Sequence, residues 1–198
     1  MYIEFTGKTA IVTGAAHGIG RAIVHGLASN GAHVWACDIL PEVLQETVDT
    51  AQPKKGGSVH SSVTDVSDAT AVSTLVEKAS ARSGRVDILV HSAGGTVGQV
   101  GQPLESVTLE QWQTIFDVNL KGAFICSQAV APGMKRAGAG RILIISSGAG
   151  LGVSLTGIQA YASAKAGQIG LVRQMAHELG PFGITVNSVA PGLSLIHI

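Results

Sequence analysis

Aromatic side chains and charged side chains are both scarce in this sequence. Aromatic residues make up 4% of its 198 residues and charged residues 13%, and 13 Lys and Arg balance 13 Asp and Glu. Because nucleic-acid-binding proteins use a basic surface and aromatic platforms that stack on bases, we expect no nucleic-acid partner. No apolar run reaches the roughly 20 residues that span a bilayer, and the start, MYIEFTGK, lacks the basic and apolar segments of a signal peptide. We therefore expect a cytoplasmic protein that enters no membrane.

Metal-binding motifs are absent as well. Cys37 and Cys126 lie in separate apolar segments without a CxxC motif, which is typical of buried, reduced thiols. The seven His residues form no HExxH motif and no cluster with cysteine, so we predict no catalytic metal. Glycine, in contrast, is abundant. Its 26 residues suit a fold with many tight turns between strands and helices.

The segment from residue 8 to residue 30 predicts a strand, a glycine turn and a helix. An apolar run over residues 9–12 suits a buried parallel strand, and Gly14, Gly18 and Gly20 follow it. A helix that begins at such a turn points free N–H groups at the ligand, which favours a pyrophosphate there. The GxxxxGK[ST] pattern of P-loop proteins is absent. On the helix, the apolar spacing predicts an inward face of Ile19, Ala22, Ile23 and Leu27.

Further alternating segments predict a parallel sheet covered by helices. Short β-rich runs alternate with helix-period runs along the chain, and this order is typical of crossover units. We predict one α/β domain over residues 1–192, a Rossmann-type doubly wound parallel sheet with six strands and no seventh. The predicted strands after the first cover 33–37, 58–63, 86–90 and 141–145, and a sixth strand followed by a Pro-Gly turn lies within 184–192. The predicted helices after the first cover 41–50, 69–82, 109–136 and 160–180.

Asp38 stands at the end of the second predicted strand. An acid at this place can accept hydrogen bonds from the ribose hydroxyls of a dinucleotide and would repel a 2′-phosphate. No Lys or Arg occupies positions 15–17 or 39–40, where a cation would have to hold that phosphate. The sequence therefore favours NAD over NADP. A protonated His17 would weaken this preference, and Asp38 could instead serve only the turn before Pro41.

Tyr161 and Lys165 are four residues apart on the predicted helix over 160–180. This spacing places both side chains on one face, where the ammonium favours the phenolate form of the tyrosine. A serine at the end of the fifth strand could hydrogen-bond a substrate oxygen as its charge changes. Ser147 is our preferred candidate and Ser146 the second. An exposed pair with this spacing would have no catalytic meaning, so the interpretation depends on the other motifs.

Taken in order, the motifs resemble the short-chain dehydrogenase/reductase family in its compact form. They are TGxxxGxG at the start, an acid after strand two, NLKG at 119–122, a serine closing strand five, YASAK at 161–165, and ITVNSVAPG at 184–192. Where the family usually has NNAG, this chain has His91 to Gly94. The resemblance implies an NAD(P)-dependent oxidoreductase that interconverts a secondary alcohol and a ketone by hydride transfer.

The resemblance also implies the site residues. By this resemblance, Tyr161 would act as general acid/base, and Asn119 would hold a water that relays protons. The residue pattern by itself favours a hydrogen bond between helices for Asn119. The implied catalytic set is Asn119, Ser147, Tyr161 and Lys165. The implied cofactor site consists of Gly14, His17, Gly18, Ile19, Gly20, Asp38, Asp65, Val66, Ser92, Ala93, Gly94, Tyr161, Lys165, Pro191 and Gly192.

Three other functions remain open on the sequence. They are a 3-oxoacyl thioester reductase that uses NADPH, a dinucleotide-binding regulator without turnover, and an epimerase or dehydratase of the longer relatives. The complete set of Ser147, Tyr161 and Lys165 disfavours the regulator, and the compact glycine spacing disfavours the epimerase. The family resemblance further implies a homodimer or homotetramer, with the helices over 109–136 and 160–180 paired across a two-fold axis.

The last six residues, LSLIHI, are unlike the family. They are the translation of CTGTCTCTTATACACATC, which resembles the transposase tag of sequencing libraries. We therefore expect the natural sequence to end at Gly192, with 193–198 a non-native tail, so that the chain resembles a C-terminally truncated member of the family.

Overall fold

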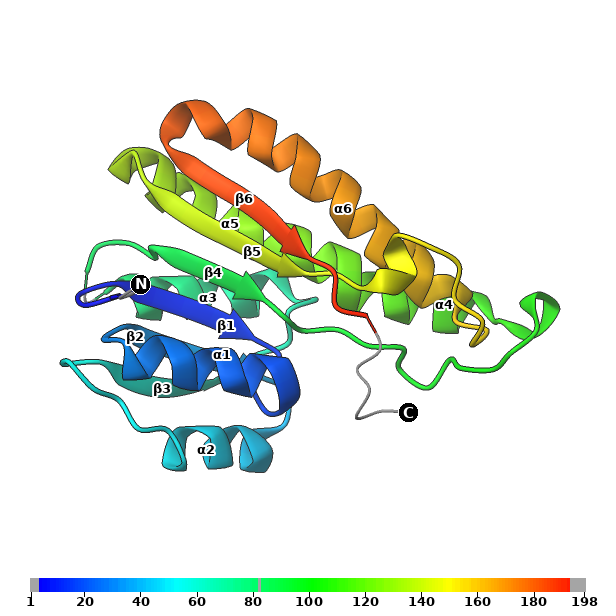
Figure 1. The fold of residues 1–198 in the computed structure, drawn as a ribbon, viewed down its shortest axis with the longest axis horizontal. Helices are drawn as coiled ribbons and strands as arrows, with labels where there is room; N and C mark the ends of the chain where they lie inside the picture. Colours follow the sequence, from blue (N-terminus) through cyan, green and yellow to red (C-terminus); the bar gives the residue numbers. More distant parts are fainter. Residues whose placement is uncertain (1–3, 82, 193–198) are drawn as a thin grey trace.

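A computed structural model describes residues 4–81 and 83–192 of the protein as a parallel sheet between two layers of helices (Figure 1). The sheet has six strands in the order β3-β2-β1-β4-β5-β6, and every neighbouring pair is parallel. This order is that of the doubly wound fold, which confirms the predicted fold class. The predicted tail at 193–198 lies outside the described residues. The strands are β1 (Thr9–Thr13), β2 (His33–Asp38), β3 (Ser58–Val63), β4 (Ile88–His91), β5 (Gly140–Ile145) and β6 (Ile184–Val189).

Helices cover the sheet in two groups, each with its own apolar core. On one face, α1 (Gly18–Ser29) and α2 (Pro41–Asp49) pack against side chains of β1 and β2. On the other face, a larger core joins the sheet to α3 (Ala69–Ser80), α5 (Gly122–Ala137) and α6 (Gln159–Leu179). No helix among the described residues is both long and apolar enough to cross a bilayer.

The packing face of α1 differs from the predicted one. Leu27 is buried as expected, but its buried neighbours are Gly20, Val24 and Ala28, whereas Ile19 is 48% exposed and Ala22 is exposed too. The helix begins at Gly18, and Ile19 in its first turn lines the cavity at the carboxyl ends of the strands. Ile19 therefore lies at the site and not in the core.

The helix predicted over 109–136 contains an irregular turn that the sequence pattern did not reveal. A capping box of Thr108 and Gln111 starts α4 (Leu109–Phe116), as predicted. A π-helical turn over Asp117–Lys121 then precedes α5. Such turns add one residue to a helix and often occur at functional sites. Here the turn contains Asn119, which is fully buried.

Candidate active site

A cavity of about 1240 Å³ lies at the carboxyl ends of the strands. This edge is where doubly wound sheets bind their ligands, and the volume exceeds the roughly 300–1,000 Å³ of pockets for drug-sized molecules. Every residue that was predicted to bind the cofactor lines the cavity, and so do Ser147 and both residues of the Tyr161–Lys165 pair. Asn119 is the exception, because it lies behind the wall.

The glycine turn leaves backbone open toward the cavity. Gly14 has φ +64°, and a Cβ there would lie 2.7 Å from the backbone nitrogen of Ala93. Gly18 has φ +56°, and a Cβ there would meet nothing within 4 Å, so this position faces open space. The helix that follows has His17 as N-cap without a side-chain cap and no acidic residue in its first turn. Its first N–H groups therefore remain free for an anion, and the turn fits a pyrophosphate.

Two carboxylates lie at the same end of the cavity. Asp38 ends β2 and accepts hydrogen bonds from the N–H of Ala16 (3.0 Å), Ile39 (2.8 Å) and Leu40 (3.3 Å). These contacts fix its orientation toward the cavity and leave lone pairs for ligand hydroxyls. Asp65 follows β3 and uses Oδ1 to accept from the backbone N–H and the hydroxyl of Ser67, both at 2.8 Å.

Thr13 organises the loop after β4, a role that the sequence analysis missed. Its buried hydroxyl accepts from the N–H of Ser92 (3.2 Å) and Ala93 (3.1 Å) and lies 3.1 Å from Nδ1 of His91. Burial first, and then the charge of Lys165, lowers the pKa of His91 to about 3. The imidazole that replaces the family's asparagine is therefore neutral at ordinary pH. In the sequence, the only sign of this role is the position of Thr13 at the end of a buried strand, directly before the glycine turn.

Asn119 supports the cavity wall. Its amide donates to the carbonyls of Gly95 (2.9 Å) and Ile115 (2.8 Å), and its Oδ1 accepts from the N–H of Gly95 (3.1 Å). All polar atoms of the side chain are thus engaged, and its backbone carbonyl accepts from Nε2 of Gln168 at 2.8 Å. Asn119 ties the π turn to the loop after β4 and to α6.

Tyr161 and Lys165 lie one turn apart on α6, as their spacing predicts. The ammonium of Lys165 is 5.5 Å from the centroid of the Tyr161 ring and donates to the carbonyl of Ile145 at 2.8 Å. Only 3% of the lysine is exposed, and this burial lowers its pKa from 10.5 to about 8. Near neutral pH the site therefore holds a desolvated cation beside the tyrosine, with two further N–H donors.

The structure separates the two candidate serines. The hydroxyl of Ser146 is buried and donates to the carbonyl of Lys165 at 2.8 Å. The hydroxyl of Ser147 is partly exposed and accepts from the N–H of Ala149 at 3.2 Å, which leaves its proton free. Both residues lie at the cavity, but only Ser147 has a hydrogen available for a ligand oxygen.

The part of the cavity beyond these residues is mostly apolar. Its wall includes Val97, Val153, Leu155 and Ile158, together with threonines and Ser154. Asp117 is the acidic residue on this side, and it is paired with Lys121 at 3.5 Å. Among the described residues, no three His, Cys, Asp or Glu side chains are grouped so that they could hold a metal ion.

Comparison with known proteins adds to this geometry. The family model for short chain dehydrogenases matches residues 8–195. The chain is 41% identical over 186 residues to (2S)-[(R)-hydroxy(phenyl)methyl]succinyl-CoA dehydrogenase subunit BbsD of Thauera aromatica, covering 94% of this chain and 73% of that protein. A short-chain type dehydrogenase/reductase from Mycobacterium ulcerans superposes with a TM-score of 0.91 at 31% identity, over 96% of this chain and 69% of that one. A 7α-hydroxysteroid dehydrogenase complexed with NADH and 7-oxo glycochenodeoxycholic acid has a TM-score of 0.87 at 36% identity, over 96% and 72%.

Proposed function

The chain belongs to the short-chain dehydrogenase family, whose members are nicotinamide-dependent oxidoreductases acting on CH–OH groups, and we propose that it interconverts a secondary alcohol and a ketone with NAD. Residues 1–192 would form the single domain that binds the cofactor and carries out the reaction. The observation that carries the proposal is the arrangement of Ser147, Tyr161 and Lys165 at the cavity that also contains the glycine turn and Asp38.

The choice of NAD over NADP rests on charge. Asp38 presents a carboxylate to the place of the adenosine ribose, and a 2′-phosphate there would meet its negative charge. Arg21 begins close by on α1, but its guanidinium points away, toward the carbonyls of Ala16 and Val43 and the carboxylate of Glu46. It would have to break these contacts to hold a 2′-phosphate. The NADPH-dependent thioester reductase is therefore the weaker alternative.

The residues divide the work of alcohol oxidation. The substrate hydroxyl would lie between Ser147 and Tyr161, where Ser147 donates its free proton as a hydrogen bond to the oxygen. Tyr161 takes the hydroxyl proton as the general base, and returns it as the acid in ketone reduction. Lys165 holds a buried charge beside the Tyr161 ring, and its remaining N–H groups would be available to the ribose of the nicotinamide half. When bound, the nicotinamide ring supplies the hydride acceptor.

An assay of cofactor reduction tests this proposal. Purified protein would be mixed with NAD or NADP and a panel of secondary alcohols, and turnover would be followed in the absorbance band of reduced nicotinamide. We expect turnover with NAD. Ser147→Ala should lower kcat about 10²–10³-fold, the usual effect of losing one donor to a reacting oxygen. Ser146→Ala, the matched control, should lose less than about tenfold, because its hydroxyl binds only a backbone carbonyl. A larger loss in Ser146→Ala than in Ser147→Ala would contradict the assignment.

A further inference from the structure

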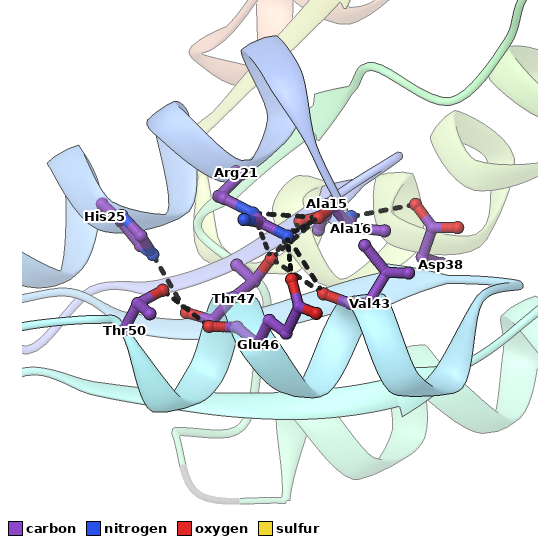
Figure 2. A network of polar contacts seen from close by, with 9 residues as sticks. All are labelled: Ala15, Ala16, Arg21, His25, Asp38, Val43, Glu46, Thr47 and Thr50. Atoms are coloured by element: carbon purple, nitrogen blue, oxygen red, sulfur yellow. Dashed lines mark hydrogen bonds and ion pairs between the residues drawn. The ribbon is translucent and has the colours of Figure 1, made fainter.

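The peptide between Ala15 and Ala16, inside the glycine turn, is held by side chains from outside the turn (Figure 2). The hydroxyl of Thr47 lies 2.9 Å from the carbonyl of Ala15 and 3.1 Å from that of Ala16, and the two carbonyls share its one proton. The carbonyl of Ala16 also accepts from Nε of Arg21 at 2.9 Å and from a second guanidinium nitrogen. On the other side, the N–H of Ala16 donates to Oδ2 of Asp38 at 3.0 Å. Each polar group of the Ala16 residue therefore has a fixed partner.

Thr47 has little reason to be polar except for this contact. It is fully buried in the last turn of α2, where its own helix offers only the carbonyl of Val43 at 3.5 Å. Its two bonds to the turn are shorter. A hydroxyl in a buried helix position lowers helix propensity and must be satisfied, so an apolar residue would otherwise suit this place.

Arg21 connects α1, on which it lies, to α2 and to the glycine turn. Its Nε donates to the Thr47 hydroxyl at 3.0 Å, and its terminal nitrogen donates to the carbonyl of Val43 at 3.2 Å and to Glu46 at 3.3 Å. One turn further along α1, Nε2 of His25 lies 2.9 Å from the carbonyl of Thr47. Figure 2 shows this row of contacts between α1 and α2, which ends at Asp38.

We propose that Arg21 and Thr47 are positioning residues for cofactor recognition, which set the Ala16 peptide and through it the carboxylate of Asp38. This inference rests on the proposed function, in which Asp38 meets the adenosine ribose and the turn meets the pyrophosphate. With the carbonyls of Ala15 and Ala16 held from α2, the N–H of Ala16 points at Asp38, and the carboxylate cannot rotate away from the ribose. Arg21 and Thr47 touch no cofactor atom in this account. They act through the turn.

The test compares nucleotide binding in Thr47→Val, Thr47→Ser and wild type. NADH and NADPH are the probes, titrated by their fluorescence, and urea unfolding is measured for each protein. Thr47→Val keeps the shape and removes the hydroxyl, so we expect the Kd for NADH to rise about tenfold, as for one lost hydrogen bond with its partners left unpaired. The Kd for NADPH should rise less, so that the preference for NADH falls. In turnover, KM for NAD should rise while kcat stays near that of wild type. Thr47→Ser keeps the hydroxyl, so its affinity for NADH and its preference for NADH over NADPH should stay near those of the wild type.

Two further variants keep the proposal open to refutation. Val72→Ala opens a buried site on α3, away from the turn, and serves as a destabilised control whose NADH preference should not change. Arg21→Lys replaces the forked guanidinium by a point charge and should also lower the preference for NADH over NADPH. It serves as the test if Thr47→Val does not fold. If Thr47→Val weakened the binding of NADH and NADPH equally, and Val72→Ala did the same, Thr47 would have only a structural role and the inference would be overturned. Unchanged NADH binding in Thr47→Val would overturn it too. A wild-type protein that binds neither nucleotide would contradict the proposed function itself.

Discussion

Lys165 should make the protein more stable at pH 10 than at pH 7, relative to a variant without the amine. The side chain is 3% exposed, and burial lowers its pKa from 10.5 to about 8 in the folded protein. Below pH 8 the folded and the unfolded chain both carry the ammonium, and the folded state bears the cost of burying it. Between pH 8 and 10.5 the folded protein releases this proton while the unfolded chain keeps it, so the free energy of unfolding rises with pH.

The size of the effect follows from the two pKa values. The difference between 10.5 and about 8 corresponds to about 3 kcal/mol at 1.36 kcal/mol per pH unit. Between pH 7 and pH 10 about 2.5 kcal/mol of this is recovered, because at pH 10 the folded amine is almost wholly neutral and the unfolded one still mostly charged. Lys165→Met keeps the length of the side chain and removes the titration. The unpaired carbonyl of Ile145 adds a cost that does not depend on pH and therefore cancels.

Urea unfolding of the wild type and of Lys165→Met at pH 7 and pH 10 measures this difference. We expect the change in unfolding free energy between the two pH values to be about 2–3 kcal/mol more favourable in the wild type. Lys78→Met removes an exposed lysine and controls for net charge, and it should respond as the wild type does. Equal pH responses of the wild type and Lys165→Met would refute the reasoning. A buried lysine that lowers stability at neutral pH is best explained by its proposed role in the active site beside Tyr161.

Four further predictions concern the cofactor site, an open helix position and a buried thiol. Asp38→Ser should raise the ratio of kcat/KM with NADP to that with NAD by at least about tenfold, since the carboxylate no longer repels a 2′-phosphate; an unchanged ratio would remove Asp38 as the selector. Gly14→Ala should lose about 2 kcal/mol or more of unfolding free energy and weaken NADH binding, because a Cβ at φ +64° would lie 2.7 Å from a backbone nitrogen. Gly26→Ala, in an open helix position, should instead stabilise the protein by roughly 0.5–1 kcal/mol in the same urea assay. Cys37, whose pKa burial raises to about 12, should resist iodoacetamide at pH 8 until urea unfolds the protein, as mass spectrometry would show.

Local sequence patterns predicted the fold, the glycine turn, Asp38 and the Tyr161–Lys165 pair, and the family resemblance implied most of the other site residues. The apolar runs, the glycine turn and the spacing of Tyr161 from Lys165 act over a few residues, so each can be read without knowing the rest of the chain. The strand order then brings the carboxyl ends of all six strands to one edge, and the predicted residues other than Asn119 line the cavity there.

The missed features depend on contacts between distant segments. The π turn at Asn119 does not disturb the apolar pattern of its helix, so the sequence does not reveal it. Only the structure shows the turn and the hydrogen bond from the N–H of Gly95 to the Asn119 side chain. The contact of Thr47 with the glycine turn joins positions about thirty residues apart, and no periodicity encodes it. The inward face assigned to Ile19 was wrong because the apolar pattern does not distinguish a core residue from one that lines the cavity.

The central claim is that Tyr161 transfers the substrate proton in a site that binds NAD. Its most direct measurement is NAD turnover with a secondary alcohol by the wild type and by Tyr161→Phe, with NADH affinity measured on the same preparations. The account predicts that kcat/KM falls by about 10²–10⁴-fold, the usual contribution of a general acid/base, while the Kd for NADH stays within about threefold. Tyr161→Phe that turns over as fast as the wild type while binding NADH equally well would contradict it.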